Sequence, residues 1–131
     1  MKVGDYVRFK DKRGNTYIRK VIDGYKAHWY GCKVDKEANN VPYVSAKNII
    51  KSSPNIIDLI EVGDYVNGYK VTMLEDEYYD DVTDSVKKIK DKEKIKIILG
   101  NEEQFYGVYA KDIKSVLTKE QFESMEYKVG E

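Results

Sequence analysis

The residues best suited to nucleophilic chemistry are the only histidine, His28, and the only cysteine, Cys32, four positions apart. A thiolate beside an imidazole base is a common activated nucleophile. In an extended strand, however, these two side chains would lie about 13 Å apart, which is too far for direct proton transfer. One cysteine also excludes an internal disulfide, and one histidine excludes the commonest structural zinc sets. We therefore expect a non-enzymatic protein with no catalytic residue, no metal site and no cofactor.

A dense run of carboxylates and tyrosines occupies residues 75–84. Carboxylate oxygens could hold Ca²⁺ or Mg²⁺, but the spacing does not fit an EF-hand loop and no glycine supplies its sharp turn. Such a segment can also imitate a nucleic-acid backbone or dock into a basic groove of a partner, and a solvated insertion is a further interpretation. The candidate partner-binding residues in it are Glu75, Asp76, Glu77, Tyr78, Tyr79, Asp80 and Asp81.

All three arginines lie within the first twenty residues. A four-residue turn at 12–15 would pair a strand at 6–10 with one at 16–22 and place Arg8 directly opposite Arg19, a like-charge pair that is mildly destabilising unless something negative covers it. That outer face could bind a phosphate backbone with stacked bases, dock on a protein or on the acidic half of the chain, or remain solvated. Its candidate binding residues are Tyr6, Arg8, Lys10, Arg13, Tyr17 and Arg19.

The net charge of zero hides an uneven distribution along the chain. Residues 1–60 contain twelve Lys/Arg and six Asp/Glu, whereas residues 61–131 contain eleven and seventeen. Two halves of opposite net charge indicate either two domains that attract one another or a basic surface that is free to bind an anionic partner. Within the acidic half, lysines recur between residues 87 and 96, but Asp91 and Glu93 interrupt them. We expect a solvated loop and strand edge there.

The chain contains an internal repeat. Val-Gly-Asp-Tyr-Val at 3–7 recurs at 62–66, and Val44–Ile49 is matched by Val108–Ile113 in the same order. The two offsets are 59 and 64, and the polar segment 75–93 can absorb the difference. This pattern predicts a duplicated module of about 55–65 residues.

Each copy is predicted to be β-structure, because short β-branched and aromatic runs alternate with turn residues. The expected core includes Phe9, Ile18, Trp29, Ile97 and Phe105. A capping box at 118–121 predicts a short helix that ends near Tyr127. We expect strands at 6–10, 16–22, 27–34, 41–44, 49–51, 64–66, 69–74, 94–99, 104–108 and 113–117.

Five short strands with one helical turn before the last resemble a small SH3-like barrel. The Gly-Asp-x-Val motif at 4–7 and 63–66 also resembles the opening strand of KOW-type nucleic-acid and ribosome-associated modules. The resemblance implies a mainly all-β chain of two tandem SH3-like small barrels with a short C-terminal helix. The implied domains are a basic module at 1–53, an apolar linker at 54–61 that packs between the modules, and an acidic module with the helix at 62–131.

The Lys/Ile/Tyr/Asn usage and the segments Pro54–Val66 and Leu117–Tyr127 resemble small uncharacterised proteins of Firmicutes phages and prophages. That resemblance implies a phage context, in which short accessory proteins act by binding host machinery. No apolar run approaches the ~20 residues that span a bilayer, and no signal-peptide pattern is present. We therefore expect a soluble protein in the cytoplasm of a bacterial host cell.

These observations favour a phage-type binding protein that engages a host protein or nucleoprotein complex. Its most specific form, which the resemblance to phage proteins implies and no motif shows, is an anti-defence inhibitor of a nucleic-acid-handling enzyme. The alternative is an accessory protein that binds nucleic acid directly through residues 6–20 of the basic module.

Overall fold

The computed structural model describes residues 2–23, 31–38, 41–100 and 103–125. The chain is mainly β, as the sequence predicts, and its sheets are antiparallel. It divides into two compact units, one made of Met1–Ile60 with Leu117–Glu131 and the other of Glu61–Val116. Among the described residues, no helix has the length and apolar character needed to cross a membrane.

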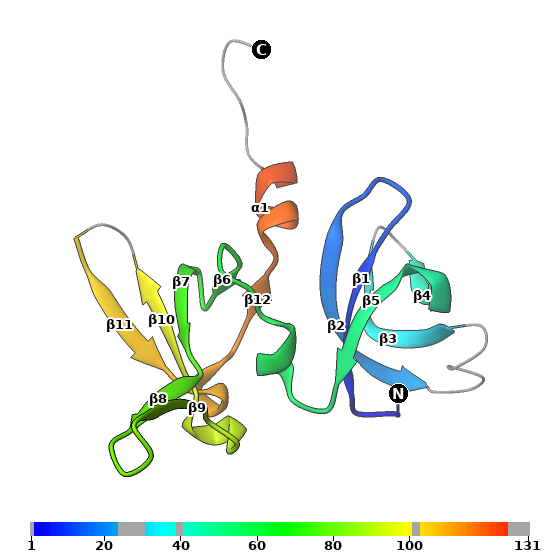
Figure 1. Cartoon of the computed structure of the whole chain (residues 1–131). Coiled ribbons are helices and arrows are strands. Elements are labelled where there is room, and N and C mark those ends of the chain that lie inside the picture. The colour runs from blue at the N-terminus through cyan, green and yellow to red at the C-terminus, as the bar shows by residue number, and fades with distance from the viewer. Residues whose placement is uncertain (1, 24–30, 39–40, 101–102, 126–131) are drawn as a thin grey trace. The chain divides into compact units, whose positions relative to one another are not determined.

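The first unit contains a five-stranded sheet with the order β4-β3-β2-β1-β5 (Figure 1). A 3-10 helix, η1 (Ala46–Asn48), precedes the last strand, and η2 (Ile56–Leu59) follows it. The strands are β1 (Tyr6–Lys10), β2 (Thr16–Asp23), β3 (Gly31–Ala38), β4 (Val41–Ser45) and β5 (Ile49–Ser53).

The second unit repeats this topology, since its sheet has the order β11-β10-β7-β6-β12. If the two-stranded insertion β8–β9 is left out, these strands correspond in chain order to β4-β3-β2-β1-β5 of the first unit. In addition, η4 (Ala110–Asp112) precedes the last strand, as η1 does in the first unit. The elements are β6 (Tyr65–Val66), β7 (Tyr69–Glu75), β8 (Glu77–Asp80), β9 (Ser85–Lys88), η3 (Lys92–Lys94), β10 (Lys96–Gly100), β11 (Phe105–Val108) and β12 (Val116–Leu117).

The repeated Val-Gly-Asp sequence forms the same turn in both units. Gly4 and Gly63 have φ angles of 95° and 99°, a conformation that glycine adopts without steric cost. The carboxylates of Asp5 and Asp64 then each accept a hydrogen bond of 2.9 Å from the backbone N–H three residues earlier. The sequence repeat therefore corresponds to a structural one.

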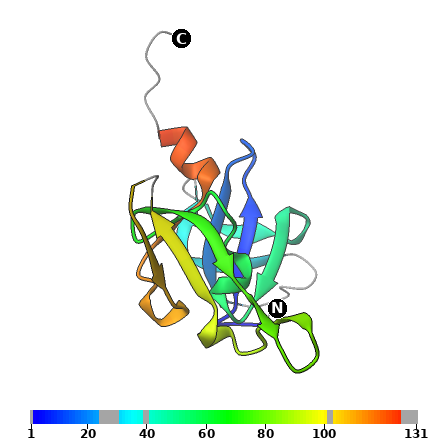
Figure 2. The same ribbon diagram turned by 60° about the vertical axis from the view of Figure 1, so that its left-hand side comes forward.

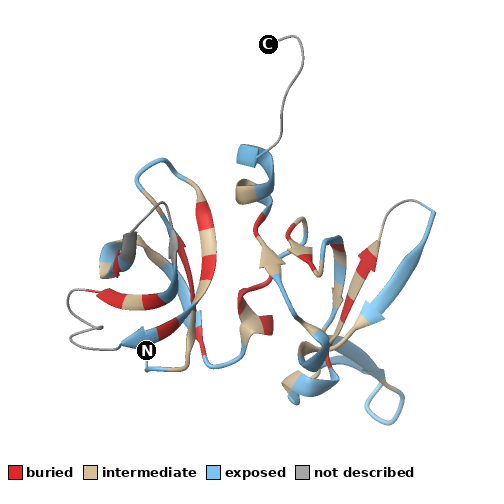
Figure 3. Cartoon of the chain, turned by 180° about the vertical axis from the view of Figure 1, so that it is seen from behind, coloured by how far each residue is buried: buried red, intermediate tan, exposed pale blue. Residues whose placement is uncertain are grey.

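Each unit has its own apolar core, visible as the buried strand residues in Figure 3. Phe9, Ile18 and Ile97 are buried, as predicted. Phe105 was expected in the core, but its side chain is 58% exposed because it lies on β11, at the edge of its sheet. Trp29 lies outside the described residues. The buried apolar residues are Val7, Phe9, Ile18, Val21, Cys32, Val34, Val44, Ile57, Leu59 and Ile60 in the first unit and Val66, Val71, Ile95, Ile97 and Leu99 in the second.

The C-terminal helix α1 (Lys119–Met125) belongs to the first unit, whereas the sequence assigned it to the second module. Thr118 precedes the helix and forms the predicted capping box: its hydroxyl accepts the Gln121 N–H at 3.2 Å, and the Gln121 amide oxygen accepts the Thr118 N–H at 3.3 Å. The Thr118 hydroxyl also donates to the backbone oxygen of Thr16. These contacts attach the end of the chain to β2.

Candidate binding surfaces

The register of the first hairpin differs by one residue from the predicted one. Arg8 pairs with Ile18, and Arg19 pairs with Val7, so the predicted Arg8–Arg19 opposition is wrong. The cause lies in the loop, where the Asp11 carboxylate accepts the backbone N–H groups of residues 13 and 15, each at 2.9 Å. Asp11 thereby joins the turn, which becomes one residue longer.

Arg8 is a buried residue rather than an exposed contact. It keeps 3% of its surface, and its guanidinium donates a hydrogen bond of 2.9 Å to the backbone oxygen of Leu59. The same group lies 3.5 Å from the carboxylate of Glu120 on α1. An arginine so placed holds the first unit together and is not accessible to a partner.

Tyr17 and Arg19 lie on the other side of the hairpin, on the face that carries the core residues Val7 and Phe9. The Tyr17 ring stacks on Phe9 with 5.7 Å between ring centroids, and the Arg19 guanidinium lies 5.2 Å from the centre of the Tyr17 ring. Burial lowers the pKa of Arg19, and the nearby Asp35 opposes that shift. Both side chains therefore pack within the first unit and contribute to its structure.

The six candidate residues of this hairpin consequently do not form one surface. Lys10 and Arg13 are exposed, and Tyr6 is half-buried with the ammonium of Lys20 at 6.0 Å from its ring. Lys20 was not among the candidates, because the predicted register turned it to the opposite face.

The acidic segment is one strand of a hairpin, β8–β9, whereas the sequence predicted no strand there. In this hairpin Glu77 pairs with Lys88 and Tyr78 with Lys87. Opposite charges on paired strands are mutually stabilising. Figures 1 and 2 show the hairpin continuing from the end of β7, with its loop projecting away from β10 and β11.

Local interactions of Asp80 and Asp84 shape the loop of this hairpin. Asp80 accepts the backbone N–H of Val82 at 3.0 Å and forms an ion pair of 2.8 Å with Lys87. The hydrogen bond from Lys87 holds the pKa of Asp80 below its usual value. The Tyr79 hydroxyl donates to the Asp84 carboxylate, and this bond raises the pKa of Tyr79. Across the described ranges, no group of His, Cys, Asp and Glu is arranged to hold a metal ion.

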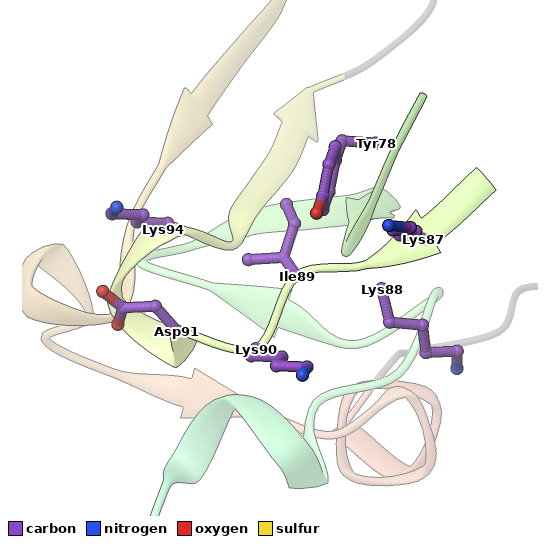
Figure 4. Close-up of a pocket in the computed structure, with 7 residues that line it drawn as sticks. All are labelled: Tyr78, Lys87, Lys88, Ile89, Lys90, Asp91 and Lys94. Atoms are coloured by element: carbon purple, nitrogen blue, oxygen red, sulfur yellow. The ribbon is translucent and has the colours of Figure 1, made fainter. Parts of the chain in front are cut away.

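A hollow of about 740 Å³ lies beside this hairpin (Figure 4). The side chains of Tyr78 and Ile89 lie close together in it, with Lys87 beside them. The segment after β9 is held by a hydrogen bond of 2.7 Å from the Ile89 N–H to the backbone oxygen of Asp76. The lining residues are Tyr78, Lys87, Lys88, Ile89, Lys90, Asp91 and Lys94.

A second hollow of about 380 Å³ shares the lining residue Lys94 with the first. It is lined by Glu93, Lys94, Tyr109 and Lys111, and the ammonium of Lys96 lies 5.9 Å from the Tyr109 ring. We call the combined area the lysine–tyrosine surface. It comprises Tyr78, Lys87, Lys88, Ile89, Lys90, Asp91, Glu93, Lys94, Lys96, Tyr109 and Lys111, so that six lysines face two carboxylates.

Sequence reasoning discounted these lysines because Asp91 and Glu93 interrupt them. In the structure, the Asp91 carboxylate caps η3 by accepting a hydrogen bond of 3.0 Å from the Glu93 N–H. The signal that could have revealed the surface is the run Lys87-Lys88-Ile89-Lys90 followed by an Asp cap.

Cys32 does not have the surroundings of a nucleophile. The thiol is buried in the core of the first unit, and burial raises its pKa. Thiolates that attack substrates have a lowered pKa and are accessible. His28, the other half of the candidate pair, lies outside the described residues.

Comparison of the chain with protein-family models, curated proteins and solved structures gives no match.

Proposed function

We propose that the chain is a non-enzymatic binding protein of phage type, and that it contacts a host macromolecule through the β8–β9 hairpin. The single observation that carries this proposal is the hairpin itself. It interrupts the second copy of the repeat, and the described residues of the first unit form no equivalent hairpin. Seven of its eight strand residues are exposed, and Asp80 is the exception.

A hairpin of this kind contributes little to the stability of its own unit. None of its residues belongs to the buried core. An isolated two-stranded hairpin is at best marginally stable, and here local polar contacts and cross-strand charge pairs maintain it. An exposed element on a rigid scaffold is where binding residues concentrate.

The scaffold supports the same proposal. In both units five antiparallel strands have one order, and a 3-10 turn precedes the last strand. This layout resembles small SH3-like barrels, and we propose that both units are such modules. Binding is the usual role of barrels of this size, including those of the KOW type.

Two half-exposed tyrosines give the hairpin the side chains that anchor interfaces. Tyr78 is 49% exposed and Tyr79 61% exposed, and both lie on the strand that carries Glu77. Tyrosine is enriched among the residues that dominate binding energy. An acidic strand with tyrosines fits a basic groove, and the most specific form of the proposal is an anti-defence inhibitor that fills such a groove on a nucleic-acid-handling enzyme.

The test is affinity capture from bacterial lysate followed by binding to the purified captured protein. Tyr79→Ala combined with Asp81→Lys should reduce affinity at least tenfold, since both side chains are exposed on the hairpin. The matched control is Phe105→Ala, another exposed aromatic of the second unit. Equal affinity of both variants for the purified protein would overturn the proposal.

The alternative function, direct nucleic-acid binding through residues 6–20, depended on Arg8 and Arg19 sharing an outer face. The observed register and the burial of Arg8 remove that arrangement.

A further inference from the structure

We propose that the lysine–tyrosine surface of the second unit binds single-stranded nucleic acid. The inference rests on the proposed function in one respect, the role of the β8–β9 hairpin as a binding element. It adds a ligand class and a separate set of residues, most of which follow the hairpin in the chain.

The surface has a local excess of positive charge. Lys88, Lys90 and Lys94 are exposed and line one hollow, whose acidic lining residue is Asp91. Within the part of the chain that the structure describes, Lys87 is the lysine of this group with an ion pair, to Asp80. Like charges held together repel, and an anion that neutralises them is favoured, even though the second half of the chain is acidic as a whole.

The cations of this surface suit a chain of phosphates. All the cations of the surface are lysines, and none is arginine. The planar fork of arginine matches a single carboxylate or phosphate in a two-pronged pair, whereas the lysine ammonium acts as a compact point charge that commonly binds phosphate. A row of such charges suits the repeating charge of a phosphate backbone.

The tyrosines favour a single strand over a duplex. Tyr78 lines the first hollow with a half-exposed ring, and Tyr109 lines the second. The faces of unpaired bases can stack on aromatic rings, whereas the faces of bases in a duplex are already stacked. Lys94 lines both hollows, and in this proposal one strand passes it between the two rings.

The size of the hollows agrees with nucleotide-sized groups. Volumes of about 740 and 380 Å³ both fall in the range of about 300–1,000 Å³ seen for small-ligand sites.

The experiment uses fluorescence anisotropy of a labelled oligothymidylate of about 16 nucleotides, the upper end of single-module site sizes, over a salt series. The test variant is Lys88→Gln/Lys90→Gln/Lys94→Gln in the full chain. The matched control is Lys10→Gln/Lys12→Gln/Lys20→Gln, which removes the same charge from exposed positions of the first unit. Oligouridylate, the corresponding duplex and polyglutamate are parallel arms, and circular dichroism checks the fold of each variant.

Three lost phosphate contacts should reduce the slope of log affinity against log salt by about 2, because each contact contributes about 0.7 on a single strand. The control should retain the slope of the unmodified chain. Tyr78→Leu should weaken binding about 5- to 150-fold with the slope unchanged, as expected for one lost base stack.

The proposal is overturned if the oligothymidylate and oligouridylate both fail to bind, or if the test and control variants lose affinity equally. Equal affinity for polyglutamate, with no effect of Tyr78→Leu, would overturn it in favour of an acidic peptide. Preference for the duplex would also contradict it. Any of these results leaves the capture experiment on Tyr79 and Asp81 intact, so the two proposals fail separately.

Discussion

The Arg8 guanidinium lies 3.5 Å from the carboxylate of Glu120, and thus joins the first strand of the chain to its last helix. Both groups belong to the first unit, although the whole second unit separates them in sequence. The Arg8 side chain is 4% exposed and that of Glu120 30%. The Arg8 side chain is therefore shielded from solvent, whereas water reaches part of Glu120.

Replacing Arg8 with methionine should lower the free energy of unfolding by about 1.5–3 kcal/mol, the range for hydrogen bonds to charged groups. The substitution removes the bond to the Leu59 oxygen and leaves Glu120 without its counterion. Glu120→Gln should cost less, because water reaches that side chain. Urea denaturation of the two variants and of the double variant measures the coupling. Unchanged stability in R8M would show that the pair is not formed in solution.

Thr118→Val should also destabilise the first unit, by about 1–2 kcal/mol for the lost helix cap. The substitution keeps the shape of the side chain but removes the hydroxyl that contacts Gln121 and the Thr16 backbone oxygen. Hydrogen exchange at β2 and α1 should increase, while exchange at β7 and β10 stays unchanged. A uniform increase in both units would contradict the assignment of α1 to the first unit.

The two phenylalanines should respond oppositely to truncation. Phe9→Ala should cost about 3–5 kcal/mol because it leaves a core cavity, since Phe9 is 3% exposed. Phe105→Ala should stay within about 0.5 kcal/mol, as for ordinary surface substitutions, because this side chain is 58% exposed. Thermal denaturation distinguishes them directly. A large loss of stability in F105A would place that ring in a packed environment.

Acid should loosen the β8–β9 hairpin through Asp80. Its pKa is lowered in the folded chain, chiefly by the hydrogen bond from Lys87. The ion pair therefore stabilises the hairpin above the unfolded pKa of about 3.9, and this contribution is lost as the pH falls through the lower, folded value. An NMR titration of the Asp80 carboxyl carbon and the Val82 amide should show a midpoint below 3.9, which Lys87→Gln should raise. A midpoint that does not respond to K87Q would argue against the ion pair.

The sequence predicted most of the scaffold because its signals are local. Alternating apolar residues and turn residues located the strands of both sheets, and the repeated Val-Gly-Asp turn identified the duplication. The capping box at Thr118 likewise fixed the start of α1.

The errors concern features that depend on distant contacts or on weak propensities. Arginine is seldom buried, and Leu59 and Glu120, which contact the buried Arg8 guanidinium, are both remote from it in sequence. The β8–β9 hairpin was missed because acidic and lysine residues have low strand propensity, and pairing across the hairpin compensates for it. The lysine–tyrosine surface was overlooked because a linear charge pattern does not show that Asp91 is engaged as a cap.

The first unit is built from two separate stretches of the chain, and this has a consequence for its synthesis on the ribosome. The backbone oxygen of Thr16 in β2 accepts a hydrogen bond from the Thr118 hydroxyl, 102 residues later, whereas all of Glu61–Val116 emerges before that residue. Domains fold as they leave the ribosome, and contacts distant in sequence form late. We expect the second unit to reach its native form first, with the first unit completed only after α1 is released. Pulse proteolysis of ribosome-stalled chains in which an added unstructured linker carries residue 116 out of the exit tunnel should therefore find the second unit protected and β1–β2 cleaved, and equal protection of both would refute this order.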